Sequence, residues 1–310
     1  MVSIIIPNYN HSRFIKKRLD SILHQTYQEF EIIILDDAST DESVKVLDNY
    51  RHHPKVENIV INRKNSGSPY RQWFNGVSMA KGEYIWIAES DDYSDLGFLE
   101  ICIAELEQNK NAGLAFCKSI FVDELDQERE ESKDFFDRFK TVDKTIFNRF
   151  VFLCNYLSKE CDILNVSSVL FRKDVFDLDV INKITTSFRL FGDWYLYQSI
   201  VTKYDVIYVN KPLNYFRKTQ KSFSSSYPPV EFLHERIDIH RFLIEKKVPL
   251  KVLESGLDHF YYDYFALSKK ELNFYKKFSL LKTIMKYDSN WFIRILNYSY
   301  YTVKDFLNCK

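Results

Sequence analysis

Residues 84–92 read YIWIAESDD, a short apolar run that ends in a cluster of carboxylates. The length and content of the run are typical of a buried strand, Tyr84–Ala88, and the pair Asp91-Asp92 follows this strand. The same arrangement recurs at Glu31–Leu35, which is followed by Asp36-Asp37. Ligands of open α/β sheets bind at the carboxyl ends of the strands. The two acidic segments therefore predict one ligand-binding edge.

Short apolar runs alternate with amphipathic segments through the first 120 residues. This pattern predicts strand–helix–strand units of an α/β fold, with a Rossmann-like, mostly parallel sheet flanked by helices. The predicted strands are Val2–Pro7, Glu31–Leu35, Val56–Asn62 and Tyr84–Ala88. The predicted helices are Arg13–Gln25, a second one capped by Ser39 or Thr40 and running to Tyr50, and a third one from the turn Asn65–Pro69 to about Ala80.

The chain has 310 residues, of which 45% are hydrophobic and 28% are charged, as in soluble globular proteins. This length accommodates a full-sized domain and a smaller appended piece. Lys and Arg together number 43, as do Asp and Glu, so the formal net charge is zero. Because binding to a phosphate backbone usually needs a basic excess, we expect no nucleic-acid partner.

The cysteines and the apolar runs bear on the cellular location. The five cysteines lie far apart without a C-x-x-C pair, which predicts reduced thiols. The apolar run at the N-terminus is short and has no cationic region before it. No apolar stretch reaches the roughly 18 residues of a membrane-spanning helix. We expect a cytoplasmic protein, at most attached to the inner face of the membrane.

The carboxylates at the end of the predicted strand Tyr84–Ala88 suit a metal ion. Asp91 and Asp92 offer hard oxygen ligands of the kind that Mg²⁺ and Mn²⁺ prefer. An ion held there would bridge the carboxylates to a diphosphate and neutralise the charge of a departing nucleoside diphosphate. A solvated acidic turn is the alternative interpretation. The neighbouring acidic strand end favours the metal site.

The first half of the chain contains four motif-like segments in a fixed order: Val2–Asn10, Ser21–Tyr27, Glu31–Asp41 and Lys64–Tyr84. The order resembles that of the family 2 inverting glycosyltransferases with the GT-A fold, densely over residues 2–120 and in patches to about 225. The resemblance implies transfer of a sugar from a nucleotide-diphospho-sugar to a hydroxyl of a glycan or lipid-linked acceptor. It also implies inversion and assistance by Mn²⁺ or Mg²⁺.

The resemblance also implies roles for single residues of the donor site. Pro7 and Tyr9 would line the nucleobase, Asp37 would hydrogen-bond the base, Arg71 would lie in the nucleotide pocket, Asp91 would contact the ribose or sugar, and Asp92 would bind the metal beside Asp91. We expect a UDP-sugar, because Tyr9 can stack on a pyrimidine and Asp37 can accept its N3–H. Each residue also has a structural interpretation: Pro7 could end a strand, Tyr9 could be core, Asp37 could cap a helix, and Arg71 could form a surface ion pair.

The chain departs from the family pattern at two positions. Glu89 stands where the family usually has the first Asp of its D-x-D signature, which lengthens one potential ligand. The segment Tyr215–Ser224 resembles a family motif in which a His often stands at the position of Thr219. The resemblance implies that Arg217, in this segment, would contact the diphosphate. A solvated basic loop is the alternative interpretation.

Asp193 is the expected general base. Gly192-Asp193-Trp194 opens a predicted helix, and the family places its base in a comparable motif, commonly Glu-Asp. An inverting transfer needs a carboxylate that takes the proton of the attacking hydroxyl. The alternative is that Asp193 only caps the helix.

These assignments divide the chain into a catalytic domain at 1–225 and a helical region at 226–310. Within the domain, 1–120 would bind the nucleotide-sugar and 121–225 would form the acceptor half. We expect the helical region to contact the acceptor, the membrane surface or another subunit, or else to pack as ordinary helices. The residues that suggest such a surface are Phe260, Tyr261, Tyr262, Tyr264, Phe265, Trp291, Phe292 and Tyr298–Tyr301, with Lys277, Lys282, Lys286 and Arg294.

Two other functions compete with sugar transfer. A catalytically silent nucleotide-sugar-binding scaffold would explain the departures at Glu89 and Thr219, but it predicts the loss of Asp92 or Asp193, and both are present. A nucleotidyltransferase of similar topology would need a glycine-rich phosphate loop after the first strand. Residues 8–12 contain no glycine.

Overall fold

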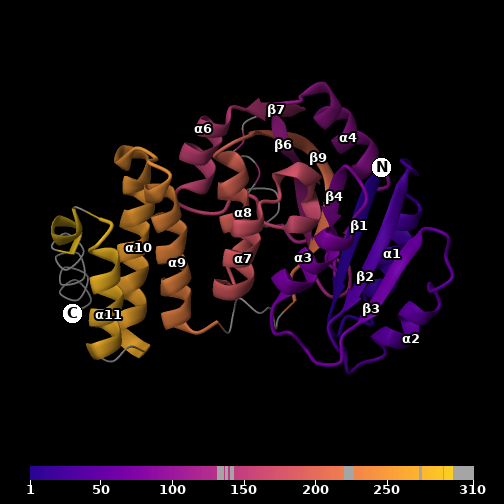
Figure 1. Cartoon of the computed structure of the whole chain (residues 1–310), viewed down its shortest axis with the longest axis horizontal. Coiled ribbons are helices and arrows are strands. Elements are labelled where there is room, and N and C mark those ends of the chain that lie inside the picture. Colours follow the sequence, from indigo (N-terminus) through magenta and orange to yellow (C-terminus); the bar gives the residue numbers. More distant parts are fainter. Residues whose placement is uncertain are drawn as a thin grey trace. The chain divides into compact units, whose positions relative to one another are not determined.

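The computed structural model describes residues 1–130, 136, 139, 143–219, 227–271, 274–288 and 290–295. The chain forms two compact units. The first comprises Met1–Phe152, Ile163–Arg189 and Ser199–Gln220, and the second comprises Leu153–Asp162, Leu190–Gln198 and Lys221–Lys310. The predicted boundary between 225 and 226 lies outside the described residues. Figure 1 shows the strands in the first unit and the C-terminal helices in the second.

The first unit is built on one sheet, whose described strands run in the order β3-β2-β1-β4-β8-β6-β9-β5, with β7 paired to β9. Strands β1, β2, β3 and β4 are mutually parallel, and β6 is parallel to β9. Strand β8 is antiparallel to both β4 and β6, and β5 and β7 are antiparallel to β9. The predicted α/β class with a mostly parallel sheet is confirmed. The strands are β1 (Val2–Asn8), β2 (Phe30–Asp36), β3 (Val56–Ile61), β4 (Tyr84–Ile87), β5 (Tyr93–Ser94), β6 (Ala112–Val122), β7 (Lys144–Phe147), β8 (Val169–Arg172) and β9 (Asp205–Arg217).

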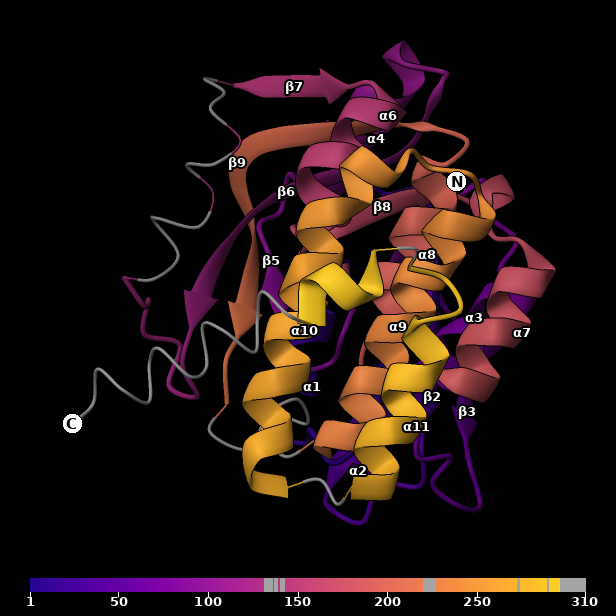
Figure 2. The same cartoon turned by 90° about the vertical axis from the view of Figure 1, so that its left-hand side faces the viewer.

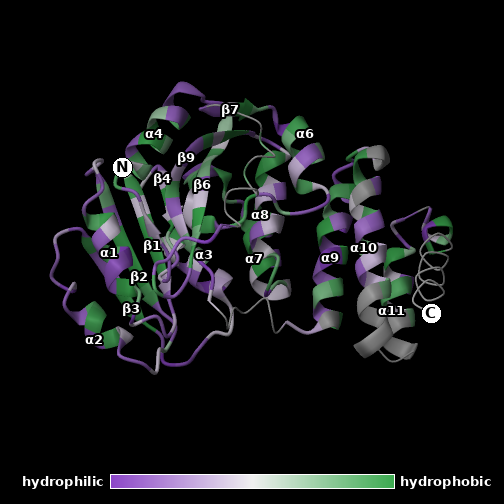
Figure 3. Cartoon of the chain, turned by 180° about the vertical axis from the view of Figure 1, so that it is seen from behind, coloured by the Kyte–Doolittle hydropathy of each residue, from purple (hydrophilic) through white to green (hydrophobic). Residues whose placement is uncertain are grey.

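Helices cover both faces of this sheet because its strands are apolar on both sides. Val2, Ile4 and Ile6 of β1 share a core with α1, α2 and α4. On the other face, α3 approaches so closely that a Cβ on Gly76 would lie 2.4 Å from the Ile5 side chain. Figure 3 shows α1 and α3 on opposite sides of the strands. The helices of this unit are α1 (Ile15–Leu23), α2 (Ser43–Asp48), α3 (Pro69–Met79), α4 (Phe98–Gln108), α6 (Arg149–Phe152) and α7 (Leu178–Ser187), with short helical turns at Val166–Ser168 and Lys173–Val175.

The four predicted strands match the observed ones to within one residue at each end. The predicted start of α2 is wrong, because α2 begins at Ser43 and neither Ser39 nor Thr40 caps it. The Ser39 hydroxyl donates to Asp36 at 2.7 Å instead, and the backbone N–H of Thr40 donates to Asn10 Oδ1 at 2.7 Å. Thr40 therefore ties together the turns after β1 and β2, and so does Ser39, whose hydroxyl also accepts the backbone N–H of Asn10 at 2.9 Å.

The second unit is helical. Helices α9 (Pro229–Glu245), α10 (Leu250–Glu271) and α11 (Phe274–Ile284) lie side by side (Figures 1 and 2). Helix α10 passes close to the π-helical turn at Leu153–Leu157, since a Cβ on Gly256 would lie 2.2 Å from the Ser158 carbonyl oxygen. Helix α8 (Gly192–Val201) starts in this unit and ends in the first. None of the helices in the described ranges is long and apolar enough to cross a membrane.

Candidate active site

The turns that follow β1, β2, β3 and β4 are joined by side-chain hydrogen bonds at one edge of the sheet. Asn8 Nδ2 donates to Asp36 Oδ2 at 2.7 Å, which links the ends of β1 and β2. Asn62 Nδ2 donates to Asp37 Oδ1 at 2.7 Å, which links β3 to β2. His11 Nδ1 lies 2.8 Å from the Ser90 hydroxyl, which links β1 to the turn after β4. The two acidic segments thus meet at one edge, as the sequence predicts.

The turn after β2 is held rigidly by its own carboxylates. Asp36 is fully buried and accepts hydrogen bonds from the backbone N–H of Ser39 at 2.9 Å and from its hydroxyl at 2.7 Å. Ala38 has φ 60° and Asn10 has φ 58°, in the left-handed region that non-glycine residues seldom occupy. The hydrogen bonds of Asp36 and Asn10 stabilise this backbone, so the turn is a fixed element of the edge.

Asp37 is a structural anchor in this structure. Its carboxylate is buried and accepts hydrogen bonds from Asn62 Nδ2 at 2.7 Å, from Gln72 Nε2 at 2.7 Å, and from both the backbone N–H and the hydroxyl of Ser66. These donors occupy both carboxylate oxygens. Asp37 therefore orders the segment between β3 and α3.

The other predicted nucleotide contacts differ in exposure. Pro7 is buried within β1, whereas the Tyr9 side chain is 44% exposed. Tyr9 is therefore not a core residue, and its ring is open to a ligand. Arg71 lies on the first turns of α3 and is exposed.

The two aspartates after β4 have different environments. Asp92 is 1% exposed, and its Oδ1 accepts the backbone N–H of Arg217 at 2.9 Å while its Oδ2 accepts Asn165 Nδ2 at 2.9 Å. The Asp91 side chain is 23% exposed. Among the described residues, the group that faces the Asp91 carboxylate is His11, whose Nε2 lies 4.0 Å from Asp91 Oδ2.

A buried cation balances this acidic turn. Arg18 is fully buried, its Nε donates to the Glu89 carbonyl at 2.8 Å, and its Nη2 lies 3.8 Å from Asp92 Oδ2. Burial lowers the pKa of Arg18 to about 10, against the attraction of Asp92, Asp91 and Glu89. The guanidinium thus stays charged at neutral pH and supports the negative charge of Asp92.

Glu89 is the third carboxyl of the cluster. Burial, together with the charges of Asp91 and Asp92, raises the pKa of Glu89 to about 8. Trp73 Nε1 donates to Glu89 Oε1 at 2.7 Å. Burial and the charge of Asp91 also raise the pKa of Asp92, to about 6, although Arg18 opposes this shift. At neutral pH the raised pKa of Glu89 favours its protonated form.

The residues at this edge fit a hard divalent ion through Asp91. Within the described residues, no group of three or more His, Cys, Asp or Glu side chains is arranged to hold a metal. Mg²⁺ and Mn²⁺ normally keep several waters and take one or two carboxylates together with phosphate oxygens. Asp91 has an open carboxylate, whereas the oxygens of Asp92 are bound by protein donors. This differs from the expectation that Asp92 is the principal ligand.

Arg217 is also committed within the protein. Its Nε donates to the Asp91 carbonyl at 2.8 Å, its Nη2 pairs with Asp126 Oδ1 at 2.5 Å, and its guanidinium lies 4.4 Å from the centre of the Phe14 ring. The side chain is buried. Arg217 therefore fixes the turn that carries Asp91, which differs from the expected diphosphate contact. Residues 220–224 of the predicted motif lie outside the described residues.

Asp193 belongs to the second unit, where it is the second residue of α8. Its Oδ1 accepts the N–H of the next residue, Trp194, at 2.7 Å. Burial raises the pKa of Asp193 to about 7, and the charge of Glu235 contributes. A carboxyl with this pKa can exchange a proton near neutral pH, as a general base requires.

Comparison with protein-family models matches residues 3–160 to Glycosyl transferase family 2. The chain belongs to this family. The match covers just over half of the sequence and includes every turn of the edge described above. The resemblance read from Val2–Asn10, Ser21–Tyr27, Glu31–Asp41 and Lys64–Tyr84 is thereby confirmed.

Curated relatives of this family 2 chain carry the names of glycosyltransferases and of a polymer synthase. A poly(ribitol-phosphate) beta-glucosyltransferase of Bacillus spizizenii is 43% identical over 96 residues, which is 30% of this chain and 15% of the relative. Glycosyltransferase GlyG of Streptococcus pneumoniae is 33% identical over 41% of each chain. A chondroitin synthase of Escherichia coli is 32% identical over 40% of this chain and 18% of the relative. The chain spans less than half the length of these relatives.

Solved structures share the fold. Residues 1–349 of Staphylococcus aureus TarS in complex with UDP-GlcNAc align with a TM-score of 0.70 at 18% identity, over 92% of this chain and 80% of that one. Mannosyltransferase PcManGT of Pyrobaculum calidifontis, in complex with GDP-Man and Mn²⁺, aligns with a TM-score of 0.56 at 15% identity, over 97% and 80%. The predicted GT-A fold is confirmed.

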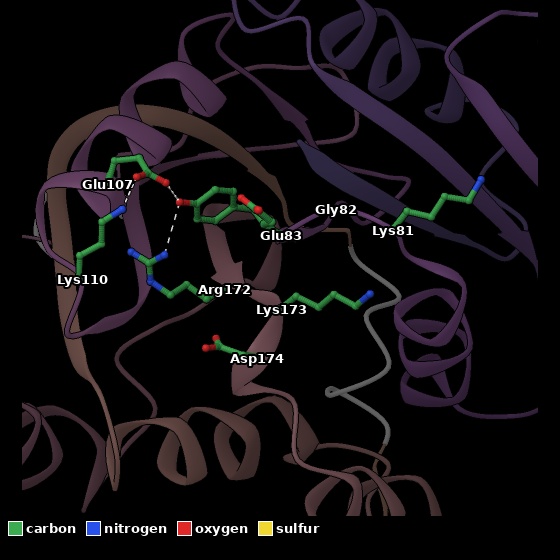
Figure 4. A pocket seen from close by; sticks show the side chains of 9 residues that line it. Lys81, Gly82, Glu83, Glu107, Lys110, Arg172, Lys173 and Asp174 are labelled. Atoms are coloured by element: carbon green, nitrogen blue, oxygen red, sulfur yellow. Dashed lines mark hydrogen bonds and ion pairs between the residues drawn. The ribbon is translucent and has the colours of Figure 1, made fainter.

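A pocket of about 700 Å³ lies away from the acidic edge of this family 2 fold. It surrounds Tyr84 at the start of β4 and Arg172 at the end of the antiparallel strand β8, whereas Asp91 follows the end of β4. Figure 4 shows Lys110 beside Glu107, with which it forms an ion pair. Lys173 Nζ donates to the Ala80 carbonyl at 2.6 Å. These charges are satisfied within the protein, so the pocket is not the predicted donor site.

Two residues of the edge were missed by the sequence predictions. Arg18 lies one helical turn from Ile15 and from Ile22, on the buried face of α1. A charged residue within the apolar stripe of an amphipathic helix is the sequence feature that could have indicated its role. His11 follows the first strand, and its polar contacts with Ser90 and Asp91 come from 79 and 80 positions along the chain. No local pattern indicates those contacts.

Proposed function

We propose that this chain is a metal-assisted, inverting glycosyltransferase that moves a sugar from a UDP-sugar to a hydroxyl of a glycan or lipid-linked acceptor. The observation that carries the proposal is the open carboxylate of Asp91 at the edge where the turns after β1, β2 and β4 meet, in a chain of family 2. Residues 1–120 would bind the donor, 121–225 would form the acceptor half, and 226–310 would form the helical extension.

The relatives support the substrate class. Their names include a poly(ribitol-phosphate) beta-glucosyltransferase and a chondroitin synthase, which act on glycan polymers. TarS, which shares the fold, has been solved with UDP and with UDP-GlcNAc. PcManGT has been solved with GDP-Man and Mn²⁺. A nucleotide-sugar donor and a divalent ion are consistent with this set.

Tyr9 and Asp37 favour a pyrimidine base. The exposed ring of Tyr9 is available for stacking beside the turn that Asp37 anchors. To accept a pyrimidine N3–H, Asp37 would exchange the hydrogen bond from the Ser66 hydroxyl for one from the base. Arg71 supplies an exposed positive charge from α3. A purine offers a different edge at this position.

The chemistry divides between two carboxylates. A Mn²⁺ or Mg²⁺ ion, when bound, would supply positive charge to neutralise the departing diphosphate. Asp91 would hold that ion, and Asp92, with Arg18 and Arg217, would keep the turn in place. Asp193 would take the proton of the acceptor hydroxyl as its oxygen bonds to the anomeric carbon and the bond to the diphosphate breaks. Attack from the opposite face inverts the anomeric centre.

A turnover assay with UDP-sugars, Mn²⁺ and a glycan acceptor tests this function, with proton NMR to read the product's anomeric configuration. We expect Asp193→Asn to lower kcat by about 10²–10⁴-fold, because the amide cannot accept the proton. The variant should stay folded, with a melting temperature at neutral pH no lower than that of wild type, and its affinity for UDP should hardly change. If the variant keeps more than about a tenth of the turnover at saturating acceptor, or if the product retains the donor's configuration, the proposed mechanism is wrong.

The C-terminal helices offer a surface for a membrane that carries a lipid-linked acceptor. Phe260, Tyr261 and Tyr264 are buried and belong to the core of the second unit, so ordinary packing explains that half of the predicted surface. The exposed apolar residues are Tyr262, Phe278, Phe292 and Ile293, and Lys282 and Lys286 are exposed as well. The side chain of Lys277 and the segment Tyr298–Tyr301 lie outside the described residues. Absence of binding to anionic vesicles at low salt would contradict membrane contact.

A further inference from the structure

The side chain of His11 lies beside the one open carboxylate that we assign to the metal. We propose that His11 is a second protein ligand of the divalent ion at Asp91. The inference rests on the proposed metal-assisted function and adds a nitrogen ligand to it. His11 follows β1 and Asp91 follows β4, so the fold itself brings the two side chains together.

The distance between the two groups suits a shared ion. His11 Nε2 lies 4.0 Å from Asp91 Oδ2. Two ligand atoms that are each about 2.1 Å from one ion lie at most about 4.2 Å apart. An ion therefore fits between the nitrogen and the oxygen, and a small rotation of either side chain brings them to adjacent coordination positions. Diphosphate oxygens and water would complete the shell.

The His11 ring is oriented in the manner of a metal ligand. Its Nδ1 lies 2.8 Å from the Ser90 hydroxyl, and the rings of His11 and Phe14 form a T-shaped pair with their centroids 6.2 Å apart. Histidine ligands usually bond their second nitrogen to a neighbouring group, which fixes the tautomer and the direction of the first. With Nδ1 engaged by Ser90, Nε2 is the nitrogen that faces Asp91.

The rest of the edge explains why a second ligand is useful. Glu89 Oε1 accepts the Trp73 Nε1 hydrogen bond at 2.7 Å, and the oxygens of Asp92 are bound by Arg217 and Asn165. Asp91 would otherwise be the single ligand from the described part of this edge, and His11 supplies an imidazole from a different segment of the chain.

Pulsed electron paramagnetic resonance of Mn²⁺ bound together with UDP tests the assignment. Directly coordinated imidazole gives ¹⁴N modulation of the Mn²⁺ echo, and selective ¹⁵N-histidine labelling of the wild-type protein should change it without any substitution. His11→Gln should abolish the modulation and weaken Mn²⁺ binding about tenfold. His24→Gln, on an exposed residue of the same segment, should leave both unchanged.

The other variants separate the possible failures. Ser90→Ala keeps the His11 imidazole but removes the hydrogen-bond partner that orients it. Nitrogen modulation should therefore remain while the affinity for Mn²⁺ falls. If His11→Gln binds Mn²⁺ like wild type while Asp91→Asn does not, the role of His11 is wrong and the proposed function stands. If the wild-type protein binds Mn²⁺ and UDP without any nitrogen modulation, the role of His11 is again wrong. If wild type binds neither Mn²⁺ nor UDP, both proposals fail.

Discussion

The pair Asp36-Asp37 and the pair Asp91-Asp92 look alike in the sequence, since each comes at the end of a buried strand. In the structure they differ in how many protein donors bind their carboxylate oxygens. Asp36 and Asp37 are both buried, and donors from residues 8, 39, 62, 66 and 72 bind their oxygens. In the second pair only Asp92 is enclosed in this way, and Asp91 is left open. The number of protein donors that reach a carboxylate decides whether it anchors a turn or can bind a ligand.

The largest effect on stability should come from the cation beneath the second pair. Arg18→Met should lower the free energy of unfolding by about 3–5 kcal/mol, because it leaves Asp92 buried without its charged partner. Urea denaturation measures this loss. Lys16→Met, two residues away on the exposed face of α1, is the matched control and should have little effect.

A double variant sharpens the same prediction. Asp92→Asn removes the buried negative charge, so Arg18→Met together with Asp92→Asn should be less destabilised than the sum of the two single variants. Strict additivity would show that the two charges do not interact, and the description of the second pair would then be wrong.

The anchoring role of the first pair predicts a smaller loss of stability. Asp37→Asn replaces a charged acceptor that binds Asn62, Ser66 and Gln72, and hydrogen bonds to charged groups contribute about 1.5–3 kcal/mol each. We expect a loss of about 2–3 kcal/mol in urea denaturation. Stability equal to that of wild type would mean that Asp37 is as free as Asp91.

Asp193 differs from both pairs. Its carboxylate accepts a backbone hydrogen bond from Trp194, and burial raises its pKa to about 7. A base acts only when deprotonated, so kcat should be constant above this pKa and fall about tenfold per pH unit below it. The raised pKa also means that ionisation costs stability, so Asp193 should lower the stability of the fold as pH rises from its ordinary value of 3.8 to about 7.

Asp193→Asn separates these two effects. The variant should lose the part of the pH dependence of stability that Asp193 causes between pH 3.8 and about 7. Its residual kcat should no longer fall as the pH drops below about 7. A wild-type profile that stays flat from pH 5 to 8 would exclude Asp193 as the base.

The smallest effect on stability should come from Asp91. Its side chain is partly exposed and has no direct hydrogen bond from the described residues, so Asp91→Asn should change the free energy of unfolding by less than about 0.5 kcal/mol. A loss as large as that of Asp37→Asn would show that the two turns are equivalent, and the contrast between them would disappear.

The sequence predicts this edge well in some respects and poorly in others, for a physical reason. The apolar runs of β1, β2 and β4 are local and fix where the carboxylates emerge, so the strands and the position of both acidic pairs follow from the pattern. Which oxygens remain open depends on Asn62 and Gln72 for Asp37, and on Asn165 and the backbone of Arg217 for Asp92. Those partners lie 25 to 125 residues away along the chain. The residues next to the aspartates therefore contain no pattern that predicts them.

The start of α2 shows the same limit at short range. Ser39 and Thr40 are residue types that often cap helices, but their polar groups bind Asp36, the last residue of β2, and Asn10, in the turn after β1. The composition of the segment predicts a capping residue, whereas the pairing of the neighbouring strands determines its actual partner.

Calorimetric titration of UDP with and without Mn²⁺, on wild type and Asp91→Asn, tests the central claim most directly. The open carboxylate predicts that Mn²⁺ strengthens UDP binding to wild type by at least about tenfold, or 1.4 kcal/mol, and that Asp91→Asn abolishes this gain while the protein stays folded. If UDP binds wild type equally well in Mn²⁺ and in a chelator, or if the variant keeps the full gain, Asp91 does not hold a metal for the donor and the account of this edge is wrong.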